Sequence, residues 1–194
     1  IRFANEKAYA LHFPDLTPYT RLSSSPKQVR AWLEEGDKPL IVKPVDGHGG
    51  NGVFLLEKGD RNIGSILESL TEDGRRMIVV QQYLESARTG DKRVIMIDGE
   101  PKGAILRVPR ADDHRGNIHV GGTVVKTDLT ERDLEICNAV GPRLREDGLS
   151  FVGLDIIGEY LTEINVTSPT GIREYKEITG VDLAEDFLDF IDRT

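Results

Sequence analysis

The sequence predicts an α+β fold with mainly antiparallel sheets and flanking helices. Three observations support this class. Strand-like segments outnumber helical ones, two pairs of such segments are separated only by tight turns, and helical segments lie beside these hairpins. The chain shows no internal repeat.

The first half of the chain is expected to combine three helices with three strands. Asn5 can cap a short helix that must end before Pro14. A stronger helix signal follows, because Ser25 is a preferred cap, Gln28 completes a capping box with it, and Gly36 is a preferred stop. The other expected elements are strands over 39–44, 52–57 and 77–84 and a helix over 62–70.

The second half is expected to contain two hairpins and two helices. Asp98 and Gly99 form a dipeptide that is typical of tight hairpin turns. Thr130 can cap a helix that Gly148 stops, and Asp182 can begin the last helix. In chain order, the expected elements are a hairpin over 92–109, a polar mobile loop over 110–122, a helix over 130–145, a hairpin over 151–166 and a helix from residue 182.

The composition is that of an ordinary globular protein. Of the 194 residues, 38% are hydrophobic and 30% are charged. The net charge of -8 argues against a broad nucleic-acid surface but leaves room for a local basic pocket. The single cysteine, Cys137, follows the apolar stripe of a helix and is expected in the core. It excludes an intrachain disulfide framework and a cysteine-based zinc site.

Two features of the chain bear on its location and extent. No apolar run approaches membrane-spanning length and no signal peptide opens the chain, so a cytoplasmic enzyme or binding domain is expected. The chain also begins without a Met, in a stretch typical of the middle of a longer sequence, so we expect a fragment of a longer protein.

Three potential metal ligands lie on the second hairpin. Glu163 and Asn165 are two residues apart on one strand and therefore share a face. A two-residue turn would place Asp155 opposite Thr162, on the other face. A three-residue turn over 158–160 would instead place Asp155 opposite Glu163.

The apolar pattern of this hairpin favours the three-residue turn. Only that register puts all its apolar positions on one face, and burial of one face specifies register strongly. These positions are Val152, Leu154, Ile156, Ile164 and Val166. Asp155 and Glu163 would then be paired like charges, which are destabilising unless a cation neutralises them. Such oxygen ligands suit Mg²⁺ that also binds a nucleotide phosphate, whereas a solvated polar face is the alternative interpretation.

Several segments together allow a family comparison. The chain contains, in this order, NEK, KPVDGHGGNGVF, QQYL, GDKRV and FVGLDIIGEYLTEINVTSPTGIRE. Over essentially its whole length it closely resembles the ATP-binding portion of the prokaryotic glutathione synthetases, which are ATP-grasp ligases. The resemblance implies an ATP-grasp fold in which two subdomains hold the nucleotide between them. These would be residues 1–88, with a glycine-rich lid, and residues 89–194, with the metal and acceptor sites. The family's N-terminal substrate domain is expected to be absent.

The resemblance also implies the residues of the site. ATP binding is implied for Lys7, Lys43, Gly47, Gly49, Gly50, Gln82, Tyr83, Leu84 and Asp91. Metal binding is implied for Asp155, Glu163 and Asn165. Catalytic roles are implied for Arg93, Arg107 and Arg115. Substrate binding is implied for Arg107, Gly121, Gly122, Ser168, Pro169 and Thr170.

The implied reaction joins γ-glutamylcysteine and glycine through an acyl phosphate and gives glutathione, ADP and phosphate. ATP is the co-substrate and Mg²⁺ or Mn²⁺ the implied cofactor, while neither nucleic acid nor a membrane is an expected partner. The parent protein is expected to be a cytoplasmic homo-oligomer. Thr123 and Glu85 stand where the family commonly has arginine and proline, and these departures bear on loop closure and substrate recognition. Two alternatives stay open: another ATP-grasp carboxylate–amine ligase, or a nucleotide-binding fragment that is inactive in isolation.

Overall fold

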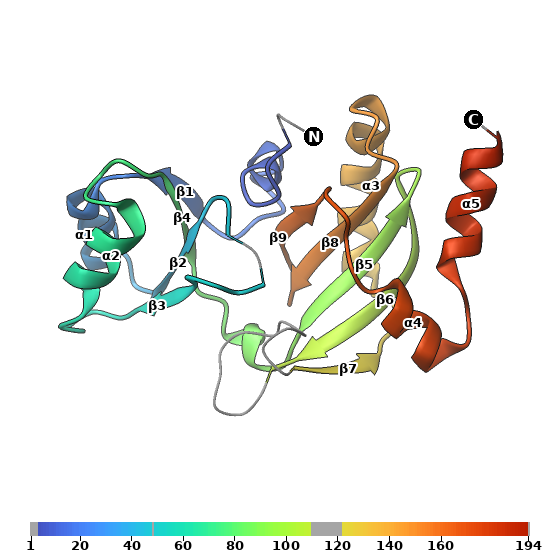
Figure 1. The fold of residues 1–194 in the computed structure, drawn as a ribbon. Coiled ribbons are helices and arrows are strands. Elements are labelled where there is room, and N and C mark those ends of the chain that lie inside the picture. The colour runs from blue at the N-terminus through green and yellow to red at the C-terminus, as the bar shows by residue number, and fades with distance from the viewer. Residues whose placement is uncertain (1–3, 48, 110–121, 194) are drawn as a thin grey trace.

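The computed structural model describes residues 4–47, 49–109 and 122–193, and it confirms an α+β fold built on two antiparallel sheets (Figure 1). The first sheet has the strand order β1-β4-β2-β3 and the second the order β7-β6-β5-β8-β9. The strands are β1 (Thr20–Ser23), β2 (Leu40–Pro44), β3 (Phe54–Leu56), β4 (Ile78–Gln82), β5 (Asp91–Ile97), β6 (Glu100–Val108), β7 (Thr123–Lys126), β8 (Phe151–Ile157) and β9 (Tyr160–Asn165). Both predicted hairpins, β5–β6 and β8–β9, are present.

Helices α1 (Pro26–Glu35) and α2 (Ile63–Thr71) cover one face of the first sheet (Figure 1). Ser25 caps α1 as predicted, because its side chain accepts a hydrogen bond from the Gln28 N–H. The predicted second half of the capping box is replaced by another contact, in which the Ser23 hydroxyl donates to the Gln28 side chain over 2.7 Å. The helices and the sheet together bury Val29, Leu33, Val42, Leu56, Leu67 and Ile78.

Helix α3 (Glu131–Glu146) covers one face of the second sheet. Thr130 caps it through a complete capping box, since its side chain accepts from the Asp133 N–H and the Asp133 carboxylate accepts from the Thr130 N–H. The apolar stripe of α3 packs on alternate residues of β5, β8 and β9. These alternate residues include Val94, Leu154 and Ile164.

The opening segment of the chain packs on the second sheet, although it precedes the first. Its 3₁₀ helix η1 (Tyr9–His12) belongs to the same core as α3, and the Glu6 carbonyl accepts from the Ile164 N–H over 3.0 Å. Asn5 accepts from the backbone N–H groups of Lys7 and Ala8, in the turn before this helix. The prediction that Asn5 caps the helix is wrong, because Ala8 stands at the N-cap of η1 and no side chain caps it. The division at residue 88 therefore stays a proposal, because this segment packs beyond it.

Helices α4 (Ile172–Thr179) and α5 (Leu183–Arg193) lie on the side of the second sheet that faces away from α3 (Figure 1). The sequence predicted α5, but it predicted neither α4 nor the short strands β1 and β7. Gly171 stands at the N-cap of α4, where a glycine provides no capping side chain. Within the described ranges, no helix has both the length and the apolar character that crossing a membrane requires.

The buried position of Cys137 on α3 predicts an unreactive thiol. Burial, with the charge of Asp133 as a second cause, raises the pKa of this thiol to about 12, and the thiolate is the reactive species. We expect a disulfide reagent to label the folded protein at least roughly a hundredfold more slowly than the protein in urea, which serves as the control. Prompt labelling of the folded protein would contradict this packing.

Candidate functional site

The hairpin β8–β9 brings the three predicted metal ligands onto one face. Asp155 pairs with Glu163 and Gly153 pairs with Asn165, as predicted from the apolar pattern. The predicted three-residue turn is wrong, because Ile157 pairs with Tyr160 across a two-residue turn. The first turn residue, Gly158, has a φ of 59°, which suits a tight hairpin turn.

A β-bulge reconciles this short turn with the observed register. The pairing shifts by one residue between Asp155 and Ile156, which leaves Thr162 as the additional residue of β9. The Thr162 hydroxyl donates to the Asp155 carbonyl over 3.1 Å. Because of the bulge, Leu161 and Ile164 both belong to the core although they are three residues apart. The bulge thus aims Glu163 away from the core.

The same face of the second sheet carries charged residues from its neighbouring strands. Arg93 of β5 lies opposite Asp155 of β8, and Asp91 of β5 lies opposite Arg107 of β6. Glu163 extends the row to β9. These residues alternate along their strands with residues that face α3, so the sheet separates a charged face from an apolar one.

Two arginines neutralise the carboxylate of Asp155. Arg93 makes a bidentate contact with it, through Nε to Oδ1 and through Nη2 to Oδ2 over 3.0 Å. Arg107 Nη2 lies 3.0 Å from the same Oδ2. Burial by itself would raise the pKa of Asp155, but the charges of Arg107 and Arg93 hold it below its ordinary value. Asp155 is therefore ionised although it is only 5% exposed.

Arg107 also contacts Asp91, and within the described part of the chain each of the two side chains has one polar atom without a hydrogen-bond partner. Arg107 Nη2 lies 2.5 Å from Asp91 Oδ2. Burial raises the pKa of Asp91 to about 6, against the opposing charge of Arg107. Among the described residues, Asp91 Oδ1 and Arg107 Nε are buried without a hydrogen-bond partner. Such atoms are uncommon in native proteins, and Asp91 lines a cavity, so its free oxygen could accept a hydrogen bond from a ligand.

An ion pair connects the two sheets across the site. Lys43 Nζ of β2 lies 2.9 Å from Glu163 Oε1 of β9, and the two side chains are 7% and 22% exposed. Burial alone would raise the pKa of Glu163, but the charges of Lys43 and Lys7 lower it. Lys7 donates to the carbonyl oxygen of Gly47, in the glycine-rich loop 45–53 that connects β2 to β3. The charges of Lys43, Lys7 and Asp155 thus all act on Glu163 between the sheets.

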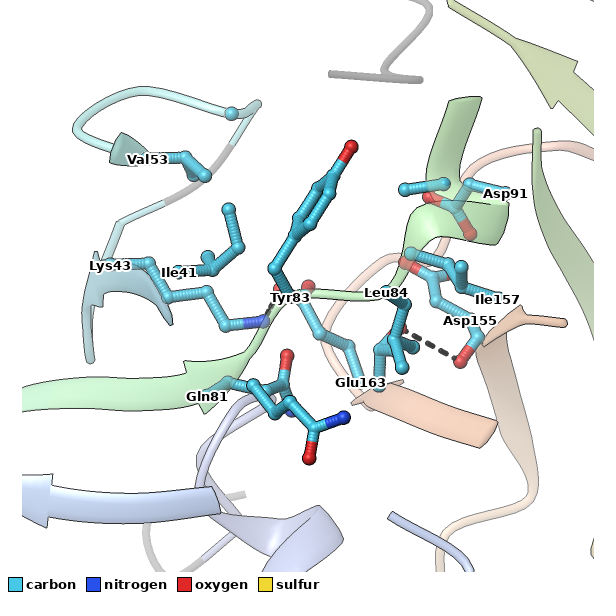
Figure 2. A pocket seen from close by; sticks show the side chains of 14 residues that line it. Ile41, Lys43, Val53, Gln81, Tyr83, Leu84, Asp91, Asp155, Ile157 and Glu163 are labelled. Atoms are coloured by element: carbon cyan, nitrogen blue, oxygen red, sulfur yellow. Dashed lines mark hydrogen bonds and ion pairs between the residues drawn. The ribbon is translucent and has the colours of Figure 1, made fainter. Parts of the chain in front are cut away.

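Two adjoining cavities open along this charged face. The first, with an empty volume of about 780 Å³, lies between the sheets, and Figure 2 shows Lys43 from one side and Asp155 and Glu163 from the other. The segment Gln82–Leu84, which leads from β4 toward the second sheet, forms part of its wall. The second, of about 960 Å³, is lined by the glycine-rich loop, Arg93 and the segment 167–170.

The cavities bring together most of the residues that the sequence indicated. The predicted residues that line the first or the second cavity are Lys7, Lys43, Gly47, Gly49, Gly50, Gln82, Tyr83, Leu84, Asp91, Arg93, Asp155, Glu163, Asn165, Ser168, Pro169 and Thr170. Arg107 is 3% exposed and contacts Asp91 and Asp155. Gly122 directly precedes β7, while Arg115 and Gly121 lie outside the described residues.

The sequence did not indicate the apolar walls of the first cavity. Ile41 of β2, Val53 of the glycine-rich loop and Ile157 of β8 line it together with Ala87 (Figure 2 labels the first three). Apolar residues at strand ends are also typical of a core, so their identity alone gave no signal that would separate the two roles. Such walls suit a flat, partly apolar group.

The chemistry of the ligand set suits a hard cation. In the described part of the chain, no three His, Cys, Asp or Glu side chains cluster in a way that could hold a metal ion. The face instead offers the two carboxylates of Asp155 and Glu163 and the amide of Asn165. The Asn165 nitrogen donates to the Gly153 carbonyl over 3.3 Å, which leaves its amide oxygen as the potential ligand. Few oxygen ligands are typical of Mg²⁺ bound together with phosphates.

Solved structures share the fold of this chain. The ATP-grasp ligase PsnB, complexed with precursor peptide PsnA2 and AMPPNP, superposes with a TM-score of 0.69 at 19% sequence identity, covering 97% of this chain and 58% of that one. The D-alanine–D-alanine ligase from Bacillus anthracis, complexed with ATP, superposes with a TM-score of 0.65 at 17% identity, covering 98% and 65%. At such identities the likeness establishes the ATP-grasp fold.

Curated sequences are much more similar. The chain is 54% identical over 191 residues to the glutathione synthetase of Gloeobacter violaceus, covering 98% of this chain and 59% of the relative. It is 51% identical over 188 residues to the glutathione synthetase of Synechococcus elongatus, covering 97% and 58%. The chain thus spans about three fifths of the length of these relatives. The family model for the ATP-grasp domain of prokaryotic glutathione synthetase matches residues 6–180, and the chain belongs to this family.

Proposed function

We propose that this chain is the nucleotide-binding and amide-forming part of a ligase that joins γ-glutamylcysteine and glycine to give glutathione, ADP and phosphate. One observation carries the proposal, namely the ion pair of Lys43 and Glu163. The two residues are 120 positions apart in sequence and come from different sheets, and Lys43 Nζ lies 2.9 Å from Glu163 Oε1. Lys43 lines the first cavity, and Glu163 lines both. Family membership supports the choice of reaction.

The first cavity is proposed to hold ATP. Its apolar walls suit the adenine base, and the backbone of Gln82–Leu84 forms the hinge beside it. The free oxygen of Asp91 would accept hydrogen bonds from the ribose hydroxyls. Lys43 and Lys7 would neutralise the phosphates, since Lys7 donates to the glycine-rich loop, Lys43 pairs with Glu163, and the charges of both act on Glu163.

The glycine-rich loop is proposed to close over these phosphates. It connects β2 to β3, which pair antiparallel, so it is a hairpin loop and does not begin a helix. Gly49, Gly50 and Gly52 adopt φ values of 64°, 77° and 71°, a region that other residues rarely occupy. Their backbone N–H groups can therefore turn toward an anion that enters the cavity.

Asp155, Glu163 and Asn165 are proposed to hold Mg²⁺ or Mn²⁺, and the bound cation would neutralise charge that develops on the transferring phosphoryl group. Lys43 and Arg107 would add positive charge at the same place. The segment Ser168–Thr170, which lines the second cavity, would hold the amine acceptor.

The proposed chemistry proceeds in two displacements. A carboxylate oxygen of γ-glutamylcysteine attacks the γ-phosphorus of ATP, so that an acyl phosphate forms and ADP leaves. The amine nitrogen of glycine then attacks the acyl carbon and loses a proton, the amide bond forms, and phosphate leaves. The residues of this chain mainly position the reactants and neutralise charge, and no protein nucleophile is needed. A cytoplasmic location and a homo-oligomeric parent protein stay predictions.

The choice of substrates is tested by an ADP-release assay on the full-length protein. We expect turnover with γ-glutamylcysteine plus glycine, at least about a hundredfold above the rate with D-alanine as both acid and amine, because a site built for one pair of polar substrates discriminates strongly. Omitting the amine is the control for ATP hydrolysis alone. Turnover with a different acid–amine pair, and none with γ-glutamylcysteine plus glycine, would assign the chain to another ligase reaction.

Replacing Glu163→Gln tests the metal site. The amide keeps the size of the side chain but removes its charge, so the Mg²⁺ concentration for half-maximal turnover should rise about tenfold or more and turnover should fall. Glu159→Gln is the matched control, because Glu159 is exposed in the turn of the same hairpin. Unchanged Mg²⁺ dependence of Glu163→Gln would show that Glu163 is not a ligand.

Replacing Lys43→Met tests the phosphate contact. Hydrogen bonds to charged groups contribute about 1.5–3 kcal/mol, so calorimetry should show about 10- to 100-fold weaker binding of a non-hydrolysable ATP analogue with Mg²⁺. Lys27→Met, on the exposed surface of α1, is the matched control. Equal affinities of the two variants would place the phosphates elsewhere.

A further inference from the structure

Arg93 is fixed on both sides of its guanidinium group. Nε and Nη2 donate to the two carboxylate oxygens of Asp155, and Nη1 donates to the carbonyl oxygen of Thr170 over 3.0 Å. Each nitrogen is therefore held by the protein, and the side chain is 6% exposed. An arginine that binds substrate directly would leave some of these donors open to solvent before the substrate arrives. Arg93 instead uses them to connect β8 to the segment before α4.

The path of Arg93 depends on the absence of a side chain at Gly153. Arg93 crosses β8 diagonally, and a Cβ built at Gly153 would lie 2.8 Å from its Cδ and 3.1 Å from its Nε and Nη1. Gly153 directly precedes Leu154 and so lies two residues before Asp155, on the same face of the strand. Real Cβ atoms do not come this close to a neighbouring carbon, so any other residue at position 153 must displace Arg93.

Arg93 runs through a slot over Gly153, and a second glycine forms the other side of this slot. A Cβ at Gly171 would lie 3.4 Å from Arg93 Cγ and 3.3 Å from Cδ1 of Ile105. Gly171 also has a φ of 123°, which favours glycine, and it begins α4 directly after Thr170. The stem of Arg93 thus runs between two glycines, from β5 to the contacts with Asp155 and Thr170.

We propose that Gly153 is a positioning residue, whose missing side chain opens the slot through which Arg93 holds the acceptor segment in fixed relation to the strand of Asp155. The proposal rests on the proposed function, because it takes 168–170 as the place where the amine binds. Arg93 joins residues that would lie beside the two reactants of the second displacement. Asp155 lies on the phosphate side and Thr170 on the amine side, and a single rigid group spans them.

Gly153→Ala in the full-length protein is the primary test. The added methyl group should push Arg93 off Thr170, so the KM for the amine should rise about 10- to 100-fold, the loss typical of a displacement near 1 Å. The KM for ATP should change less than the KM for the amine, because the hinge and the lysines are untouched. A crystal structure of this variant should show Arg93 away from the Thr170 carbonyl, a readout that does not depend on activity.

A double-mutant cycle separates this role from general crowding of the sheet. Arg93→Ala removes the atoms that the new methyl group would meet, so Gly153→Ala should have little further effect on the amine KM or on the Tm in that background. Gly103→Ala is the matched control, because it adds a methyl group on the same sheet face, where its Cβ would lie 2.6 Å from the ring of Tyr175. Its effect on Tm should be the same with Arg93 or Ala at position 93.

The outcomes distinguish this inference from the proposed function. If the unmodified protein makes no glutathione, the proposed function is wrong. The crystal structure of Gly153→Ala and the Tm values of the double-mutant cycle then still show whether Arg93 depends on the space at Gly153. If the protein is active but Gly153→Ala leaves the amine KM unchanged, or its effects add to those of Arg93→Ala, the positioning role is wrong. If Arg93→Ala does not fold, an intact contact between Arg93 and Thr170 in the crystal structure of Gly153→Ala overturns the proposal.

Discussion

The buried charge of Asp155 is the constraint on which the site depends. A carboxylate at 5% exposure is unfavourable unless cations stand against it, and here Arg93 and Arg107 do so from two other strands. The arginines can reach it only if β5, β6 and β8 pair in the observed register. Hydrophobic packing against α3 fixes that register from the opposite face of the sheet. The core on the α3 face therefore determines the geometry of the charges on the opposite face.

The same reasoning explains what the sequence could predict about the hairpin β8–β9. The apolar positions predicted the pairing of Asp155 with Glu163, because the burial of one face does not depend on the turn. They predicted the wrong turn length, because a two-residue turn with a bulge at Thr162 and a three-residue turn give the same pairing beyond the bulge. Similarly, Ser25 and Thr130 identified α1 and α3, whereas α4 begins at a glycine and depends on tertiary packing.

The meeting of the two sheets was accessible only through family resemblance. Nothing local in the sequence connects Lys43 to Glu163, since 120 residues separate them and each lies on a strand with its own core. The structure supplies this link, and it also adds the contact of Asn5, whose side-chain amide donates to the Val45 carbonyl over 3.0 Å. The opening segment therefore packs on the second sheet and holds the glycine-rich loop of the first. One short segment therefore contacts residues of both halves of the molecule.

Glycine has two different physical roles in this site, one in backbone conformation and one in the space left for a neighbouring side chain. In the loop between β2 and β3, Gly49 and Gly52 adopt positive φ, and a Cβ at Gly49 would meet nothing within 4 Å, so that glycine provides backbone freedom in open space. Gly153 lies in a regular strand and provides space alone, since Arg93 fills the volume of its missing side chain. Under the proposed function the loop would close over the phosphates, whereas Arg93 would have to keep its position between Asp155 and Thr170. The sequence presents both as glycine, and only the neighbouring atoms show which role each one has.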